Sequence, residues 1–340
     1  MYQHLKRNLA ILCCDSGLGH LKRMSYLAEK FNTKKFNVTI YADKKKFFYL
    51  KKKKVIKNGI FFKHLKTYTS YTNLKKNFQN STSWHKKIKE IDKYDLVISD
   101  NLPEILEIRP DAILFANFFW HEVMPNYPLK HKLFLRNIIK KNSPYIFGFK
   151  YFAQKHIKKQ KNFNEVNLFQ TTRLRKKQIK NSVLFTSGYD GNLKLNFDKK
   201  FFDKLNLKSP LKIIYYIEPR YYKKNFPNNV KKAIYSKFMY QSLFCTIGRP
   251  GMSTVMECIN SKVKFFSMYE KQNIEMFFNS NIIKKLKLGK TIKNQADIAK
   301  EILNYVNSNS NQKIFNKNIN KIKLNNIKLL VKKIEKIGNF

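Results

Sequence analysis

A histidine occupies a glycine-rich turn near the start of the chain, within the stretch GLGH at residues 17–20. The apolar run before it predicts a buried strand, and the run after it predicts an amphipathic helix over residues 20–31. Such a turn directs the first backbone N–H groups of a helix beyond the end of a strand, where phosphate is attracted. The helix dipole there disfavours the charged form of histidine. A neutral imidazole can accept a proton, so His20 is a candidate general base, with a structural role as cap or packed side chain as the alternative.

A second strand-turn-helix pattern occupies residues 248–261, GRPGMSTVMECINS. An apolar strand runs into a Gly-Arg-Pro-Gly turn, and four apolar residues at helical spacing follow it. Ser253 and Thr254 fall at the predicted helix start, where their N–H groups and hydroxyls could hold a diphosphate. Glu257, one turn later, could accept two hydrogen bonds from a ribose diol, as acids do in dinucleotide folds. The spacing Thr254-x-x-Glu257 also matches a capping box, so a helix cap is the alternative.

Further polar residues accompany these two patterns. Arg23 lies three residues after His20, where it could bind phosphate or form an exposed salt bridge. Residues 269–280, YEKQNIEMFFNS, follow a predicted strand and therefore place Glu275 and Asn279 near its carboxyl end. Polar residues before a helix are common, so this third stretch indicates a binding site only together with the other two.

The sequence around these residues predicts strands that alternate with helices. Strands are predicted at 8–16, 36–43, 59–65, 94–100 and 111–119, and again at 181–191, 211–219, 242–251 and 262–269. The lysine-rich residues 128–180, with helical patches, are expected to carry the connection between the two halves. Alternating strands and helices predict a doubly wound parallel sheet, here formed twice. Ligands of such sheets bind beyond the carboxyl ends of the strands.

The length of 340 residues and the hydrophobic content of 43% are sufficient for two domains with cores of their own. We expect an α/β protein with an N-terminal Rossmann-like domain over residues 1–165 and a C-terminal one over 166–311. The helical segment 312–340 could pack back on the N-terminal domain.

The net charge of +47 at pH 7 suggests an anionic partner, but the type of basic residue argues against nucleic acid. Only eight of the 69 basic residues are arginine, the residue that binds bases and phosphates through paired hydrogen bonds. Lysines spread along a whole chain are typical of a solvated surface, and attraction to an anionic membrane surface is the alternative. No specific nucleic-acid partner is expected.

The four cysteines form no C-x-x-C pair, so neither a zinc site nor a disulfide framework is indicated. A reducing cytoplasm fits this cysteine usage. No apolar run approaches the roughly 18 residues of a membrane helix, and the apolar stretch near the N-terminus is too short for a signal peptide. We expect a cytoplasmic protein, with peripheral binding to the inner face of the membrane as an option.

In this order, the stretches resemble motifs of GT-B nucleotide-sugar enzymes. The group they resemble most is the glycosyltransferase family that contains the peptidoglycan lipid-linked N-acetylglucosamine transferase and its uncharacterised relatives. Residues 17–23, GLGHLKR, resemble the GxGHxxR turn of that family and the same turn of the UDP-sugar hydrolase of pseudaminic acid synthesis. Residues 251–257 resemble its donor-binding G-x-x-T-x-x-E segment. Residues 274–279 resemble its E/Q-Q-x-x-N segment, with Met276 in place of the glutamine, and residues 94–101 resemble the N-domain strand that ends at the cleft.

The resemblance implies a GT-B fold, in which two Rossmann-like domains face one another across a cleft. It implies a metal-independent, hexosyltransferase-like glycosyltransferase, without a cofactor, that moves a sugar from a nucleotide-diphosphate donor, UDP-type favoured, to a hydroxyl acceptor. The acceptor would be a glycan, a lipid-linked molecule or a small molecule. His20 is the implied catalytic base. The implied substrate-binding residues are Gly17, Gly19, Arg23, Asp100, Asn101, Ser187, Gly188, Gly251, Ser253, Thr254, Glu257, Glu275 and Asn279. No Asp-x-Asp pair occurs, which fits an enzyme in which helix N-termini neutralise the diphosphate.

Two other functions stay open. The same histidine could activate water in a nucleotide-sugar hydrolase, although this chain is longer than such hydrolases usually are. A non-enzymatic binder of nucleic acid or membrane would need an aromatic-basic platform or an arginine cluster at a groove, and the sequence indicates neither.

Overall fold

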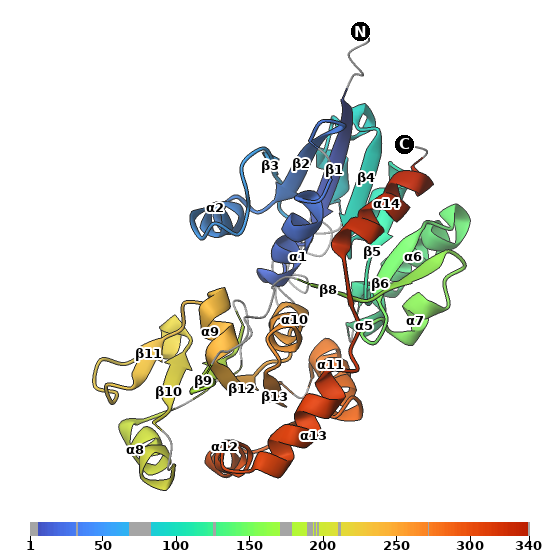
Figure 1. Ribbon diagram of the computed structural model, residues 1–340. Coiled ribbons are helices and arrows are strands. Elements are labelled where there is room, and N and C mark those ends of the chain that lie inside the picture. The colour runs from blue at the N-terminus through green and yellow to red at the C-terminus, as the bar shows by residue number, and fades with distance from the viewer. Residues whose placement is uncertain are drawn as a thin grey trace. The chain divides into compact units, whose positions relative to one another are not determined.

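The computed structural model describes the chain except for residues 1–5, 32, 68–82, 125–126, 171–178, 189–192, 194, 196, 210–211, 271 and 339–340. The chain divides into two compact units (Figure 1). Unit 1 comprises residues 1–169 and 325–340, and unit 2 comprises residues 170–324. The helix α13 (Asn309–Ile319) belongs to unit 2, so the segment that joins unit 1 begins at Asn325 and not at the expected residue 312.

Unit 1 is built on a seven-stranded sheet in the order β3-β2-β1-β4-β5-β6-β7. The strands are β1 (Arg7–Cys13), β2 (Phe36–Ala42), β3 (Phe61–His64), β4 (Leu96–Asp100), β5 (Ile113–Phe115), β6 (Ile146–Phe149) and β7 (Phe163–Val166). Every neighbouring pair is parallel. The chain therefore winds outward from β1 in both directions, which confirms the doubly wound α/β prediction for the first half.

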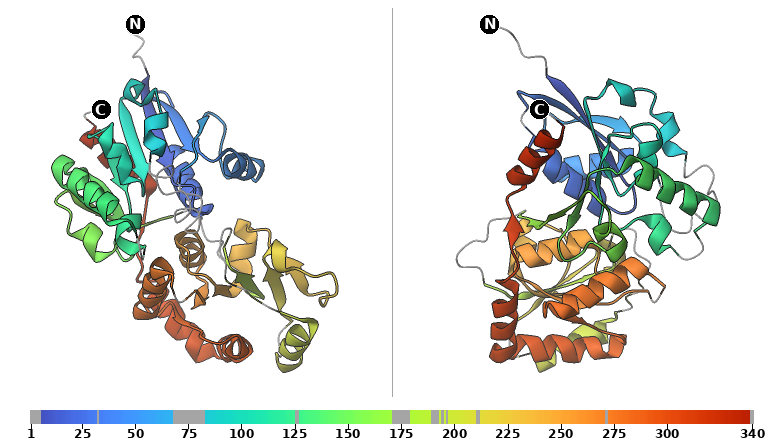
Figure 2. Two further views of the ribbon diagram at one scale, coloured as in Figure 1. Left: turned by 180° about the vertical axis from the view of Figure 1, so that it is seen from behind. Right: turned by 90° about the vertical axis from the view of Figure 1, so that its right-hand side faces the viewer.

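Helices cover both faces of this sheet. They are α1 (Gly19–Ala28), α2 (Lys44–Lys52), α5 (Trp120–Val123), α6 (Leu129–Asn142), α7 (Lys155–Lys158) and α14 (Ile327–Ile337), with 3-10 turns η1 (Trp84–Lys87), η2 (Ile91–Lys93) and η3 (Pro103–Glu107). Figures 1 and 2 show α1 and α14 on one face and α6 on the other. The apolar face of α1 supplies Leu21, Met24 and Leu27 to the core because these residues recur at helical spacing.

The expectation that residues 128–180 connect two halves is wrong for most of that stretch. It forms α6, β6, α7 and β7, which complete the sheet of unit 1, and then β8 (Leu168–Phe169). β6 and β7 span four residues each, so no long apolar run marks them among the lysines. β8 pairs with β15 (Leu324–Asn325), where the chain returns to unit 1.

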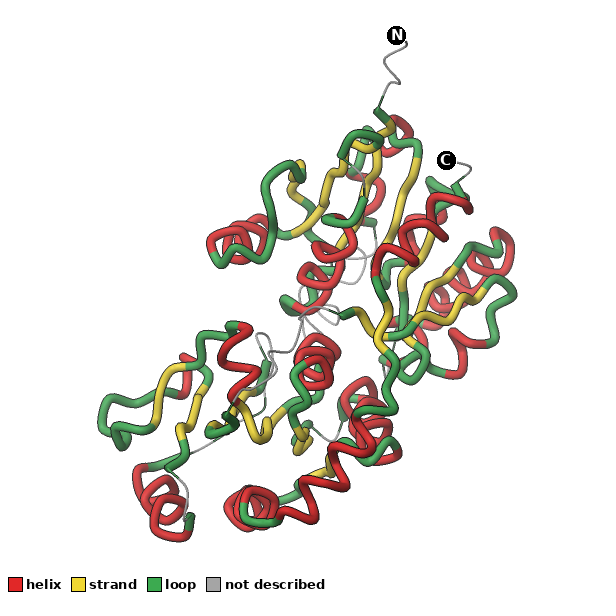
Figure 3. The backbone as a smooth tube through the Cα atoms, viewed as in Figure 1, coloured by secondary structure: helices red, strands yellow, loops and turns green. Residues whose placement is uncertain are grey.

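Unit 2 repeats the same winding with a six-stranded sheet in the order β11-β10-β9-β12-β13-β14. Its strands are β9 (Ser182–Thr186), β10 (Ile214–Ile217), β11 (Val230–Lys232), β12 (Leu243–Gly248), β13 (Lys264–Ser267) and β14 (Gly289–Thr291), all paired in parallel. Its helices are α8 (Lys199–Lys208), α9 (Lys237–Ser242), α10 (Met252–Asn260), α11 (Ile274–Lys285), α12 (Ile298–Val306) and α13, with turns η4 (Pro219–Tyr221) and η5 (Gln295–Asp297). Figure 3 shows the strands of each sheet flanked by helices.

In each sheet the winding reverses between two neighbouring strands. In unit 1 these are β1 and β4, with Cys13 opposite Asp100. In unit 2 they are β9 and β12, with Thr186 opposite Gly248. A crevice opens at the carboxyl ends of such strands because the connecting helices leave to opposite faces. The predicted site residues follow these four strands or lie close to them.

Candidate active site

The turn between β1 and α1 holds His20 at the start of a helix. Gly17 has a φ of 77°, a left-handed conformation that glycine adopts without the cost that a Cβ imposes. Asp15 fixes the beginning of the turn, because its carboxylate accepts hydrogen bonds from the N–H of Thr67 at 3.1 Å and from its hydroxyl at 3.0 Å. Gly19 is the first residue of α1, and His20 is the second. The predicted position of the histidine in the first helical turn is therefore confirmed.

His20 is bound to Asp100, the last residue of the neighbouring strand β4. Its Nδ1 lies 2.8 Å from Oδ2 of Asp100, whose side chain is completely buried. An ionised carboxylate only accepts hydrogen bonds, so Nδ1 must carry a proton. Nε2 has no hydrogen-bond partner among the described residues, and the side chain is 13% exposed. In the neutral form of the ring, Nε2 is the nitrogen that can accept a proton.

Arg23 completes this cluster from the next turn of α1. Its Nη2 donates to Oδ1 of Asp100, and its guanidinium lies over the rings of Phe115 and Phe149, 5.2 and 5.8 Å from their centroids. The side chain is buried, so the expectation of an exposed salt bridge is wrong. Nη2 also lies 3.2 Å from Nδ1 of His20, but that nitrogen already holds a proton and cannot accept. Arg23 thus binds Asp100.

The Asp100 carboxyl stays ionised in spite of its burial. Burial raises its pKa, but the positive charge of Arg23 and the hydrogen bonds from His20 and Arg23 outweigh this effect, and the pKa lies below its usual value. A buried charge without such partners would be neutralised instead. The ion pair therefore maintains the acceptor that orients His20.

Asn101 follows Asp100 and turns the chain away from the sheet. It has a φ of 64°, which asparagine tolerates better than most residues, and its side chain is buried. Its amide fits between the Phe118 carbonyl, to which its nitrogen donates, and the Trp120 indole, whose N–H it accepts at 3.3 Å. These contacts hold the chain after β4 against the segment after β5.

In unit 2, the turn between β12 and α10 requires glycine at its first position. Gly248 has a φ of 150°, and a Cβ there would lie 1.6 Å from the Thr186 carbonyl oxygen on the neighbouring strand. Gly251 is the N-cap of α10 and makes no side-chain cap. Ser253 and Thr254 are therefore the second and third residues of the helix, where backbone N–H groups have no acceptor within the helix. The predicted position of Ser253 and Thr254 in the first turn of α10 is confirmed.

The capping-box alternative for Glu257 is wrong. A capping box needs the threonine at the N-cap and the acid at the third helical position. Because the N-cap of α10 is Gly251, three residues before Thr254, Thr254 occupies the third helical position and Glu257 the sixth. The Glu257 side chain is buried.

The third predicted stretch forms the start of α11. Asn279 is buried and donates from Nδ2 to the Pro250 carbonyl at 2.9 Å, so it fixes the turn that precedes α10. Glu275 is half-buried in the first turn of α11. Met276 is buried in the core.

Ser187 and Gly188 follow β9, the strand beside β12, and belong to a cluster that sequence reasoning missed. The Glu218 carboxylate accepts from the Ser187 N–H at 2.7 Å and pairs with Arg220 Nε at 2.6 Å. Arg220 also donates to the Ser187 hydroxyl and, at 2.7 Å, to the Gly188 carbonyl. The Tyr221 hydroxyl contacts Ser187 Oγ at 3.2 Å.

The sequence does contain a pattern that could have predicted this cluster. Glu218 and Arg220 flank the proline that ends the strand β10, in the stretch IEPR, at the carboxyl end of a predicted strand. The chain has eight arginines, and the two that the structure describes in unit 2, Arg220 and Arg249, both follow strands at this edge of the sheet. Arg249 pairs with Glu270 at 3.2 Å. Guanidinium groups are the side chains best suited to bind phosphate oxygens in pairs.

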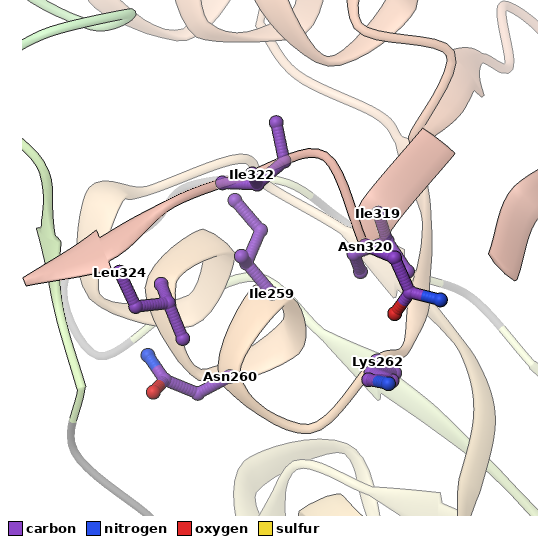
Figure 4. Close-up of a pocket in the computed structure, with 7 residues that line it drawn as sticks. All are labelled: Ile259, Asn260, Lys262, Ile319, Asn320, Ile322 and Leu324. Carbon is purple, nitrogen blue, oxygen red and sulfur yellow. The ribbon is translucent and has the colours of Figure 1, made fainter. Parts of the chain in front are cut away.

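One pocket of about 160 Å³ lies elsewhere in unit 2. It is lined by Ile259, Asn260, Lys262, Ile319, Asn320, Ile322 and Leu324 (Figure 4). These residues come from the C-terminal ends of α10 and α13 and from the chain that follows each helix, whereas the candidate site lies at the N-terminal end of α10. The pocket is therefore separate from the residues discussed above.

Two searches of the described part of the chain have negative results. No group of three or more His, Cys, Asp or Glu side chains there is arranged to hold a metal ion. No helix among the described residues has the length and apolar character needed to cross a membrane.

We compared the sequence and the structure with those of known proteins. No protein-family model matches the chain, and no curated protein matches its sequence. Solved structures do match over nearly the whole length. The glycotransferase of kitacinnamycin has 12% identity and a TM-score of 0.68, covering 98% of this chain and 99% of its own. The chain has the GT-B fold.

Two nucleotide complexes are among the similar structures. Arabidopsis thaliana UGT89C1 with UDP has 11% identity and a TM-score of 0.64, covering 98% of this chain and all of its own. The spinosyn rhamnosyltransferase SpnG with thymidine diphosphate has 10% identity and a TM-score of 0.63, covering 97% of this chain and all of its own. At such low identities the similarity establishes the fold, and the function must be argued from the site.

Proposed function

We propose that the protein is a glycosyltransferase that moves a sugar from a nucleotide-diphosphate donor to a hydroxyl acceptor. The observation that carries this proposal is the His20–Asp100 pair at the start of α1, in a chain with the GT-B fold. A neutral, oriented imidazole at the carboxyl end of a parallel sheet is the group that hydroxyl activation requires.

In the proposed reaction, unit 1 supplies the base. Asp100 holds the Nδ1 proton of His20, and Nε2 takes the proton of the acceptor hydroxyl as its oxygen attacks the anomeric carbon of the sugar. The bond between that carbon and the diphosphate oxygen breaks, and the diphosphate leaves with the electron pair. Asp100 stabilises the imidazolium that forms, because its buried carboxylate carries the opposite charge and accepts the Nδ1 hydrogen bond.

Unit 2 is proposed to hold the donor. The open N–H groups at the start of α10 bind diphosphate oxygens, and Ser187 and Gly188 form the turn after the neighbouring strand β9. Arg220 supplies positive charge beside that turn, which allows the leaving diphosphate to be stabilised without a metal ion. Glu257 binds the ribose diol, and Glu275 contributes to sugar binding from α11.

The similar structures guide the choice of substrates. UDP is bound in UGT89C1 and in LpCGTa, thymidine diphosphate is bound in SpnG, and another complex of UGT89C1 holds quercetin. We therefore favour UDP-type and thymidine-type hexose donors and a small-molecule hydroxyl acceptor, with glycan or lipid-linked acceptors as further options. We also propose a cytoplasmic protein that binds the membrane peripherally, supported by the net charge of +47.

A panel of nucleotide sugars tests the proposal in two steps. Ligands that bind only the folded protein raise its melting temperature, so UDP- and TDP-sugars should raise it and free sugars should not. The donors that bind are then incubated with pooled hydroxyl acceptors, and glycosylated products are detected by mass spectrometry. Release of free sugar from the donor, equally fast with and without acceptor, would assign the site to a hydrolase. No thermal shift with any nucleotide would refute both enzymes.

A further inference from the structure

The outer face of α2 combines exposed aromatic rings with lysines. Phe47 and Leu50 anchor the helix to the core of unit 1, whereas Phe48 and Tyr49 are 48% and 39% exposed. The ring of Phe47 stacks on Phe62 of β3 at a centroid distance of 4.3 Å. The helix is thus held rigidly beside the edge strand of the sheet (Figure 1), and the exposure of its rings is not a result of loose packing.

The spacing of residues places these rings among cations. Lys44, Phe48 and Lys52 recur every four residues and share one face of the helix, with Lys45 and Tyr49 on the adjoining stripe. All five side chains are exposed. We call this set the α2 face.

The charge around the α2 face is mainly positive, and the carboxylate nearest in the chain, Asp43, caps the start of α2. Residues 44–66 contain ten lysines and no Asp or Glu. Within the described residues, Lys57 pairs with Glu29 and Lys63 with Glu90, but no carboxylate lies within 4.0 Å of the lysines of the α2 face. These cations are therefore available to an external anion.

A second exposed apolar patch lies on α6, but the positive charges there are partly paired with a carboxylate. Leu129, Leu133 and Phe134 are exposed there. The Glu122 carboxylate, however, binds Arg136 through two hydrogen bonds of 2.6 and 2.8 Å and also lies near Lys132. The cations of α6 are partly neutralised, so α6 lacks the uniform positive field of the α2 face.

We propose that the α2 face docks unit 1 onto an anionic lipid bilayer. Lysine ammonium groups would bind lipid phosphates, and the Phe48 and Tyr49 rings would enter the interface between headgroups and acyl chains, where amphipathic aromatic rings are favoured. Charge alone would fit nucleic acid as well, but exposed rings on the same helical face fit a bilayer, which offers an apolar layer beneath its anionic surface. The inference rests on the membrane association included in the proposed function, and it is independent of sugar transfer.

The test is co-sedimentation of the full-length protein with vesicles. Phosphatidylcholine vesicles that contain phosphatidylserine should bind the protein, and vesicles of phosphatidylcholine alone should not. The variant Lys44→Gln/Lys45→Gln/Lys51→Gln/Lys52→Gln removes the three lysines of the α2 face and the exposed Lys51 of the same helix. It should lower the partition coefficient by at least about tenfold, since each lysine near an anionic surface contributes roughly 1 kcal/mol. The variant Phe48→Ser/Tyr49→Ser should also bind less, and its residual binding should be more sensitive to salt.

Matched controls distinguish this surface from diffuse charge. The four exposed lysines of α8, replaced in Lys199→Gln/Lys200→Gln/Lys204→Gln/Lys208→Gln, remove the same charge from unit 2. Leu133→Ser/Phe134→Ser removes the same kind of apolar surface from α6. Both controls should bind vesicles within about twofold of the natural protein, because a screened charge acts over only about 10 Å.

Three outcomes would overturn the proposal. Equal losses in the α2 and α8 variants would indicate unspecific charge, and unchanged binding of Phe48→Ser/Tyr49→Ser would indicate that no ring enters the bilayer. Preferential binding of an oligonucleotide over vesicles would assign the α2 face to nucleic acid. Nucleotide-induced thermal shifts of the same variants should equal that of the natural protein, so a failed docking surface is distinguishable from a failed donor site.

Discussion

The turn after β1 and the turn after β12 share a backbone design but differ in their chemistry. Each joins a central strand to a helix whose N-cap makes no side-chain hydrogen bond, at Leu18 for α1 and at Gly251 for α10. By contrast, α2, α8 and α11 are capped by the side chains of Asp43, Asp198 and Asn273. The two helix starts at the winding reversals thus leave their N–H groups to other partners.

The difference arises from the neighbouring strand. Beside α1, the strand β4 ends in the buried carboxylate of Asp100, which binds both His20 and Arg23. Beside α10, the strand β9 ends at Thr186 and is followed by Ser187 and Gly188, and the carboxylate at that turn, Glu218, comes from the end of β10 and is paired with Arg220. In the proposed function, the first helix start supplies the proton acceptor and the second binds an anion.

The strongest test of this contrast removes the base. We expect His20→Ala to lower kcat by about 10²–10⁴, the usual contribution of a general base, while the Kd of the donor nucleotide changes less than twofold because no donor group is altered. Steady-state kinetics and calorimetry measure the two quantities. His64→Ala, which changes an exposed histidine on β3, is the matched control and should leave kcat unchanged. A kcat of His20→Ala near that of the control would reduce His20 to a structural residue.

The second test removes the charge of Asp100. In Asp100→Asn the buried guanidinium of Arg23 loses its counter-charge, so we expect a loss of about 3 kcal/mol in the free energy of unfolding, measured by urea titration. The double variant Arg23→Gln/Asp100→Asn should recover part of this loss, because no unpaired charge remains buried. Additive losses in the double variant would contradict the coupling of the two residues.

The same carboxyl predicts a pH dependence. Its pKa is lower in the folded protein than in the unfolded chain, where aspartate titrates near about 3.9. The stabilisation is therefore complete above that pH and is lost as the pH falls through the lower folded value. Urea titrations between these limits should show a slope for the natural protein that Asp100→Asn lacks.

Sequence reasoning found the two turns because their signals are local. Apolar strands, glycines and helical spacing place His20 and the start of α10 correctly, and they locate Asp100 at a strand end. The pairing of His20 with Asp100 joins residues 80 positions apart, so it depends on the register between β1 and β4, which no short pattern encodes.

The sequence suggests an exposed Arg23 and a capping Glu257, and each difference from the structure has a physical reason. Arg23 is buried although arginine usually lies at the surface, because the carboxylate and two aromatic rings replace its solvent. Glu257 was open to a cap role because glycine at the N-cap gives no side-chain signal, so the helix start could be set three residues too late. Tertiary partners, absent from a local pattern, decide both positions.

A smaller effect is expected at Glu257. If its carboxylate binds the ribose diol, glutamine weakens the interaction, because one of its two terminal groups donates hydrogen bonds instead of accepting them. Glu257→Gln should then raise the Kd of UDP about tenfold, equivalent to about 1.4 kcal/mol, with little change in the melting temperature of the free protein. Deoxyuridine diphosphate, which lacks one of the two hydroxyl donors of the diol, should show less difference between the two proteins. Equal UDP affinities would remove Glu257 from the donor site.

The smallest and most selective test compares two glycines of one turn. Gly251 has a φ of −66° and open space around the position of a Cβ, so Gly251→Ala should leave the melting temperature nearly unchanged. Gly248→Ala must instead place a methyl group against the Thr186 carbonyl at a φ of 150°, and should lower the melting temperature strongly.

If a diphosphate approaches the start of α10 closely, the methyl group at position 251 will meet the ligand and not the protein. We therefore expect Gly251→Ala to weaken UDP binding a few-fold while uridine, which lacks phosphate, binds as before. An equal loss for both ligands would mean that the turn shapes the nucleoside site, and an unchanged UDP affinity would place the diphosphate away from α10.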